Sequence, residues 1–111
     1  MSGTLYIVAT PIGNLSDISE RAIEVLKQCD LIAAEDTRHS KILLCRFNIK
    51  TKVKAYHEHN ESQLTSQLIQ QIIDGKFIAL ISDAGTPLIN DPGYKLVTAA
   101  YYNRIKVIPI P

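Results

Sequence analysis

Cysteine is scarce in this chain of 111 residues, which contains only Cys29 and Cys45. Their separation matches no metal-binding or redox pattern, so zinc ribbons and disulfide-stabilised secreted domains are excluded. Both residues lie in segments whose patterns predict helix. We therefore expect two reduced, partly buried thiols in a cytosolic protein.

Long apolar runs are also missing. No stretch approaches the roughly 18 residues that a membrane-spanning helix needs, and the N-terminus lacks the basic region, apolar core and small-residue cleavage site of a signal peptide. No repeat, low-complexity tract or flexible linker interrupts the chain. With 46% hydrophobic and 21% charged residues, the composition predicts one globular cytoplasmic domain with a substantial core.

The chain lacks an excess of either charge, because its formal net charge is +1. A domain that binds nucleic acid unaided usually carries a clear basic excess. The local distribution differs from the average, since no acidic residue occurs between Asp36 and Glu58 while half of all Lys and Arg fall there. Two interpretations stay open, a surface for phosphate contacts and a solvated helix face with its following loop. The basic residues are Arg38, Lys41, Arg46, Lys50, Lys52 and Lys54.

Five short apolar runs alternate with four helix-like segments, which predicts an α/β fold with a mostly parallel five-stranded sheet flanked by helices. Asp17 with Glu20 resembles a capping box at the first helix, Asn60 is a candidate N-cap, and Gly75 is a helix stop. The expected strands span residues 5–9, 31–34, 53–56, 77–81 and 105–108. The expected helices span residues 17–28, a short segment around 42–44, the stretch through 64–73, and 92–102.

The loops with unusual residues, at 10–17, 35–39, 57–61 and 82–93, each follow a predicted strand. In a parallel sheet they therefore meet at one edge, where ligands bind in α/β proteins. The last loop, SDAGTPLINDPG, is built for backbone contact because Gly85 permits close approach of a ligand and Pro87 and Pro92 stiffen the chain. The chain has neither a dinucleotide fingerprint nor a P-loop.

Two side-chain groups in these loops are candidates for chemistry. Glu35 and Asp36 are either solvated carboxylates in a strand-end turn or groups for acid, base or positioning chemistry next to Arg38, and we favour the second reading. His57 and His59 suggest a metal ligand pair. Zinc sites need three or four ligands, so we expect a polar loop with a helix-capping role and no metal.

The sequence ends just after its fifth predicted strand, at Pro109-Ile110-Pro111. A core strand is an unusual place for an α/β domain to end. We therefore expect residues 1–111 to be the N-terminal α/β domain of a two-domain protein whose C-terminal domain is absent from this sequence and begins where the last βα loop would.

Three motifs resemble those of a known family in their residues, their order and their spacing. They are LYIVATPIGNLSDISERA near the N-terminus, AAEDTR at 33–38 and LISDAGTPLINDPG at 80–93. Together they resemble the N-terminal domain of the tetrapyrrole methylase superfamily, in the branch that methylates small-subunit ribosomal RNA. The resemblance covers essentially all 111 residues. The three motifs together are specific, whereas each alone is less so.

The resemblance implies an S-adenosyl-L-methionine-dependent enzyme, usually dimeric, that methylates the ribose 2′-hydroxyl of a cytidine in the decoding region of small-subunit (16S) ribosomal RNA. It implies two α/β domains with the cofactor between them. Glu35 or Asp36 is then the candidate base or ribose-positioning group, and Arg38 a contact to a flanking phosphate. The implied cofactor contacts are Pro11, Ala84, Gly85, Thr86 and Ile89.

This chain departs from the tetrapyrrole enzymes of the superfamily at two motifs. Their first loop is usually of the type Gly-x-Gly-Pro-Gly-Asp, whereas residues 9–14 here read ATPIGN, and Thr86 replaces the aspartate of their second motif. Both differences favour the ribosomal RNA branch. Two alternatives stay open: a binding or dimerisation module whose catalytic groups all lie in the absent half, and a tetrapyrrole or diphthine-type methyltransferase.

Overall fold

The computed structural model describes residues 2–10, 15–82 and 92–111, and within them five strands form one parallel sheet. This confirms the α/β class. The sheet has the order β3-β2-β4-β1-β5. The strands are β1 (Thr4–Ala9), β2 (Leu31–Ala34), β3 (Val53–Ala55), β4 (Phe77–Ser82) and β5 (Lys106–Ile110). The helices are the 3₁₀ turn η1 (Leu15–Asp17), α1 (Glu20–Gln28), α2 (Thr37–Arg46), α3 (Glu61–Ile73) and α4 (Pro92–Tyr102).

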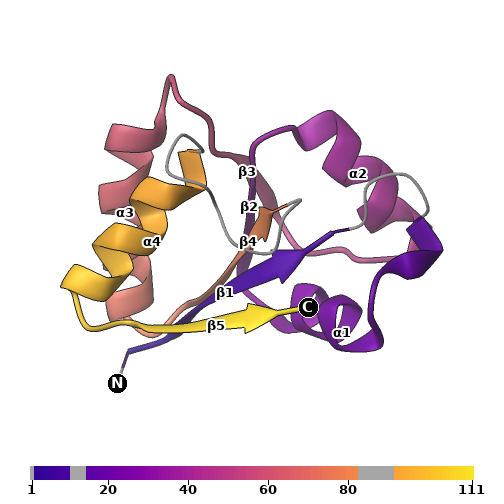
Figure 1. Ribbon diagram of the computed structural model, residues 1–111, viewed down its shortest axis with the longest axis horizontal. Helices are drawn as coiled ribbons and strands as arrows, with labels where there is room; N and C mark the ends of the chain where they lie inside the picture. Colours follow the sequence, from indigo (N-terminus) through magenta and orange to yellow (C-terminus); the bar gives the residue numbers. More distant parts are fainter. Residues whose placement is uncertain (1, 11–14, 83–91) are drawn as a thin grey trace.

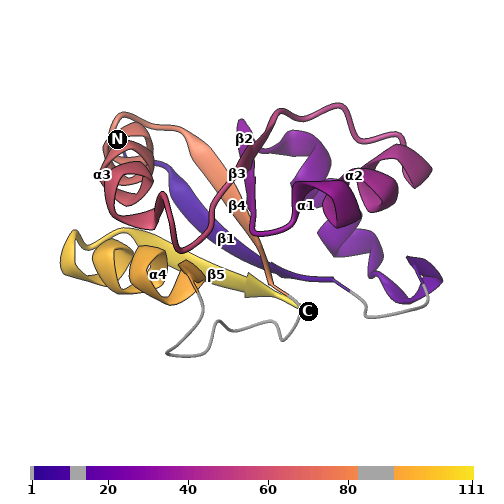
Figure 2. The same ribbon diagram turned by 90° about the horizontal axis from the view of Figure 1, so that it is seen from above.

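The strand order places the helices in two layers (Figures 1 and 2). From β1 to β2 to β3 the chain moves towards one edge of the sheet, and from β3 to β4 to β5 it moves back towards the other. Because parallel crossovers are right-handed, the two directions of travel put their helices on opposite faces. Helices α1 and α2 therefore cover one face, and α3 and α4 the other.

Each face of the sheet has its own apolar core. Leu64, Leu68 and Ile72 of α3, with Leu96 and Ala100 of α4, pack against one face. The other face is covered by a second cluster, which contains Ala22, Val25 and Leu26 of α1, Leu43 and Leu44 of α2, and Ile18 just before α1, among others. Strand β2 is buried along its whole length, as its continuous apolar run predicts for a strand covered on both faces.

The start of α1 differs from the expectation. The helix begins at Glu20, not Asp17, and its N-cap is Ser19, whose hydroxyl accepts a hydrogen bond from the Ala22 N–H at 3.1 Å. Asp17 lies in the preceding 3₁₀ turn, so the predicted capping box was wrong. The Ser19 hydroxyl also donates to the Pro111 carbonyl at 2.6 Å. A contact with a residue 92 positions away cannot be seen in a local pattern.

The predicted stop after α3 is confirmed. The helix ends at Ile73, and Gly75 adopts a φ of 107°, a left-handed conformation that glycine reaches without a steric penalty. The Gly75 N–H donates to the Ile72 carbonyl at 2.9 Å, and the Lys76 N–H donates to the Gln71 carbonyl at 3.0 Å. The turn therefore satisfies carbonyls that would otherwise lack partners at the helix end.

Both cysteines are free thiols, but only Cys29 is buried. Cys45 lies in α2 and is exposed, so the expectation of two partly buried thiols was wrong for this residue. None of the helices formed by the described residues is long and apolar enough to cross a membrane.

Candidate functional site at the carboxyl edge of the sheet

The carboxyl ends of four neighbouring strands lie level and end in small residues. Ala9 of β1 pairs with Ser82 of β4, and Ala34 of β2 pairs with Ala55 of β3. The pairing of Ala33 with Leu80 joins these two halves. Ala9 and Ala55 are partly exposed, whereas Ala34 is buried. Ligands of open α/β sheets bind beyond this edge, at the carboxyl ends of the strands.

The topology also shows where this edge opens. Strands β2 and β4 are hydrogen-bonded neighbours, but the chain leaves β2 towards β3 and leaves β4 towards β5, in opposite directions across the sheet. Ligands in open α/β sheets bind where neighbouring connections diverge in this way. The loop at 35–36 follows β2 directly at that point.

Asp36 has a structural role that the sequence interpretation missed. It is the N-cap of α2, and its Oδ1 accepts hydrogen bonds from the N–H groups of Arg38 at 3.0 Å and His39 at 3.3 Å. The available signal was an aspartate directly before a helical segment. Because Oδ1 is engaged in the cap, only Oδ2 of this exposed carboxylate is available to a ligand.

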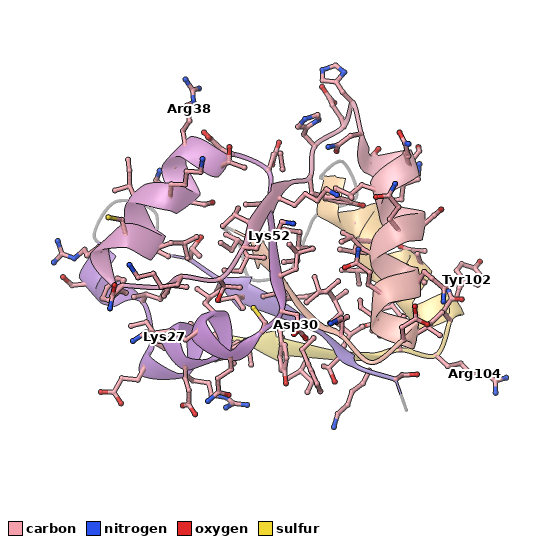
Figure 3. The ribbon with its side chains drawn as sticks, turned by 180° about the vertical axis from the view of Figure 1, so that it is seen from behind. Lys27, Asp30, Arg38, Lys52, Tyr102 and Arg104 are labelled. Atoms are coloured by element: carbon pink, nitrogen blue, oxygen red, sulfur yellow. The ribbon has the colours of Figure 1, made fainter. Side chains whose placement is uncertain are left out.

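Glu35 and Arg38 lie at the same edge as Asp36 and are both exposed. Glu35 follows the last residue of β2, and Arg38 lies in the first turn of α2, at its outer end (Figure 3). Within the described part of the chain, neither side chain has a hydrogen-bond or ion-pair partner. The structure therefore places both candidates beside the divergence point with their polar groups free to meet a substrate.

The loop after β3 has a different construction from the expected helix cap. Asn60 stands at the N-cap position of α3 but makes no side-chain capping bond. Its amide instead donates to the Ala55 carbonyl and accepts from the His57 N–H, both at 2.9 Å. The predicted cap was therefore wrong. The side chain of Asn60 holds the loop at residues 57–60 together.

The two histidines of this loop face one another. The His59 N–H donates to Nδ1 of His57 at 3.2 Å, and the ring centroids are 5.7 Å apart. In neutral His57 the proton is then on Nε2. Among the described residues no group of three or more His, Cys, Asp or Glu side chains could hold a metal ion.

A buried tyrosine anchors the same loop. The Tyr56 side chain is 1% exposed, and its hydroxyl lies 2.6 Å from Oγ1 of Thr65 in α3. Burial raises the pKa of this hydroxyl above its ordinary value of 10.0. The Tyr56 N–H donates to the Ala34 carbonyl at 2.8 Å, so the end of β3 is fixed beside the residue that precedes Glu35.

The residues that the resemblance implies as cofactor contacts, Pro11, Ala84, Gly85, Thr86 and Ile89, lie outside the described residues. The six basic residues of the segment 37–57 are described, and all six are exposed.

A sequence model of the family Tetrapyrrole (Corrin/Porphyrin) Methylases matches residues 4–111. A curated protein named "Ribosomal RNA small subunit methyltransferase I" from Halalkalibacterium halodurans is 59% identical over 109 residues, which cover 98% of this chain and 38% of that protein. The protein of the same name from Escherichia coli O157:H7 is 57% identical, with the same two coverages. The chain thus spans about two fifths of the length of these relatives.

Solved structures share the fold at low sequence identity. Uroporphyrin-III-C-methyltransferase from Thermus thermophilus superposes with a TM-score of 0.74 at 21% identity, covering 98% of this chain and 48% of that one. A structure described as a diphthine synthase from Entamoeba histolytica has a TM-score of 0.63 at 18% identity, with coverages of 97% and 40%. These likenesses concern the fold alone.

Proposed function

This chain belongs to the tetrapyrrole methylase family, and we propose that it is the N-terminal domain of an S-adenosyl-L-methionine-dependent enzyme that methylates a cytidine 2′-hydroxyl in small-subunit ribosomal RNA. One observation carries the proposal: relatives more than 50% identical over nearly the whole chain are named for methylation of small-subunit ribosomal RNA. The enzyme would act in the cytoplasm as a homodimer.

The carboxyl edge supports a cofactor at this position. Ligands of open α/β sheets bind at the carboxyl edge where neighbouring connections diverge, as they do here after β2 and β4. Pro11, Ala84, Gly85, Thr86 and Ile89 are the proposed contacts. When bound, S-adenosylmethionine supplies an electrophilic methyl group. The opposite wall of the site would come from the rest of the full-length protein.

Glu35 is the proposed base or ribose-positioning group. Methyl transfer to a hydroxyl requires alignment, exclusion of water and removal of a proton from a weak acid. Of the two neighbouring carboxylates, Asp36 uses one oxygen to cap α2, whereas both oxygens of Glu35 are free among the described residues. We therefore propose that Glu35 removes the proton or positions the ribose. Arg38 would bind a flanking phosphate, because its planar guanidinium suits bidentate contact.

The direct test is a transfer assay with the full-length protein, tritiated S-adenosylmethionine and small ribosomal subunits that lack the modification. Digestion of the RNA to nucleosides should place the label in 2′-O-methylcytidine. Glu35→Gln should reduce the rate at least 100-fold, whereas Glu58→Gln, an equal charge change at an exposed position of the neighbouring edge loop, should keep it within about two-fold. Label on a base, or no label in the RNA, would refute the proposal.

A further inference from the structure

The segment from α2 to β3 is basic and contains no acidic residue. Its basic residues are Arg38, Lys41, Arg46, Lys50, Lys52 and Lys54, on α2, on the turn that follows it and on β3, and they are called the basic rim below. All six side chains are exposed, and within the described residues none of them forms an ion pair. Strand β3 is at the edge of the sheet, so the basic rim also lies at the outer side of the fold.

The backbone under the basic rim is fixed. Ile49 is buried, and its N–H donates to the Leu44 carbonyl at 2.8 Å. The Thr51 hydroxyl donates to the Leu26 carbonyl at 2.5 Å, and the Lys52 carbonyl accepts from the Ile32 N–H at 2.8 Å. The positive charges of the turn are therefore carried on a rigid support and not on a free loop.

Three lysines of the basic rim share one side of the chain. Lys50, Lys52 and Lys54 are exposed, while Thr51 and Val53 between them are partly buried. Lys54 lies in β3, where alternate residues are on the same side of the strand. Lysine side chains on one side of the chain suit contacts to successive phosphates of a nucleic acid strand.

The basic rim offers almost no aromatic surface. Phe47 is the one Phe, Tyr or Trp in residues 37–55, and the Arg46 guanidinium lies 6.0 Å from its ring centroid. The exposed aromatic side chains elsewhere are Tyr94, Tyr101 and Tyr102 on α4 and Phe77 at the start of β4. Figure 3 shows Tyr102 on the opposite side of the molecule from Arg38. Single-stranded nucleic acids are bound by stacking on aromatic rings, and residues 37–55 offer only the exposed His39 and the partly buried Phe47 for this.

The basic rim begins at the candidate site. Arg38 is in the first turn of α2, two residues from Asp36. Helix α2 has ten residues and is about 15 Å long, so the basic rim extends that far from the carboxyl edge, to Arg46. A nucleic acid lying on this surface would therefore pass the carboxyl edge of the sheet.

We propose that the basic rim holds the sugar–phosphate backbone of a double-helical RNA segment adjacent to the methylated nucleotide. Proteins recognise double-stranded RNA mainly through its shape, its phosphates and its 2′-hydroxyls, which suits a charged, rigid surface with few aromatic rings. The inference rests on the proposed function and adds to it the form of RNA that this domain binds.

The test measures binding of the full-length protein to two RNA probes of equal length, a hairpin duplex unrelated to ribosomal RNA and oligouridine. The variant Lys50→Gln/Lys52→Gln/Lys54→Gln is compared with a control of equal charge change at the amino ends of β4 and β5, Lys76→Gln/Arg104→Gln/Lys106→Gln, whose three residues are also exposed. Thermal melting of both variants checks that they fold as the wild type does.

The basic-rim variant should weaken duplex binding at least ten-fold and oligouridine binding less than two-fold. The slope of log K against log salt for the duplex should fall by about 2 to 3, which is 0.7 to 0.9 for each lost phosphate contact. The control should change neither. Equal weakening of both probes, or an effect no larger than the control's, overturns the inference. If the wild type still methylates small subunits, the proposed function stands in either case.

Discussion

At the scale of single residues, the neighbouring carboxylates Glu35 and Asp36 have different surroundings. The Asp36 carboxylate closes the first turn of α2 through two N–H groups, and Glu35 has no partner among the described residues. Of these adjacent residues of the same charge, only Asp36 makes a structural contact in the described part of the chain. The sequence identified the pair and its edge, but not this difference, because capping depends on the φ and ψ angles at which the helix starts.

Alanine substitutions should separate the two roles. Asp36→Ala should lower the free energy of unfolding by about 1 kcal/mol, since it removes an N-cap. Glu35→Ala should change it by less than about 0.5 kcal/mol, as expected for an exposed residue without partners. Urea unfolding followed by circular dichroism measures both. A larger loss for Glu35→Ala than for Asp36→Ala would contradict this assignment.

The Tyr56 hydroxyl is the next residue-scale test. Tyr56→Phe keeps the ring in the core but leaves Oγ1 of Thr65, itself buried, without its partner at 2.6 Å. An unsatisfied buried hydroxyl costs about 1 to 3 kcal/mol. The double variant Tyr56→Phe/Thr65→Val, which removes both polar groups, should recover part of that loss in the same unfolding experiment. No difference between the single and double variants would argue against the pair.

The two thiols should differ in their reaction with a thiol reagent. Burial raises the pKa of the Cys29 thiol from 9.0 to about 11, and the thiolate is the reactive form. At pH 8 the exposed Cys45 should therefore react rapidly and Cys29 only on unfolding. In Cys45→Ser the rapid phase should vanish. A rapid phase of unchanged size in this variant would show that Cys29 is accessible.

The raised pKa of the Cys29 thiol predicts that the folded protein becomes less stable at high pH. Cys29 binds its proton more tightly in the folded than in the unfolded protein. Its contribution to the free energy of unfolding is therefore complete below pH 9 and declines as the pH rises towards 11. Tyr56 acts in the same direction above its ordinary pKa of 10.0. The melting temperature should therefore fall from pH 9 upwards.

At the scale of elements, the sequence predicts a helix boundary correctly where the signals for that boundary are local. The helix Pro92–Tyr102 was predicted with its exact bounds, because an Asp-Pro pair is a strong local start signal. For α1, the sequence predicted a cap at Asp17. The structure has Ser19 as the cap, and its hydroxyl also donates to the carbonyl of Pro111, the residue after β5. A tertiary contact of this kind has no local sequence pattern.

Ser19→Ala tests this element directly. It removes the hydroxyl that accepts from the Ala22 N–H and donates to the Pro111 carbonyl. The free energy of unfolding should fall by about 1 to 2 kcal/mol. The matched substitution Asp17→Ala should have an effect below about 0.5 kcal/mol, because Asp17 does not cap α1. Equal losses for the two variants would restore the capping box as the better description.

At the scale of the whole molecule, the alternation of apolar runs and helical segments predicted the parallel sheet, but not its order. The order β3-β2-β4-β1-β5 pairs strands far apart in the chain, so no local pattern contains it. The order in turn locates the opening between β2 and β4. The sequence alone therefore predicts that the loops after the strands share one edge of the sheet. The position of the candidate site along that edge follows only from the structure.

The central claim is that this domain supplies one wall of an S-adenosylmethionine site that the rest of the full-length protein completes. Calorimetric titration of S-adenosylmethionine into the full-length protein and into residues 1–111 tests it most directly. The account predicts measurable binding to the full-length protein and binding at least 100-fold weaker to the domain alone. Equally tight binding to both, or none to the full-length protein, would contradict it.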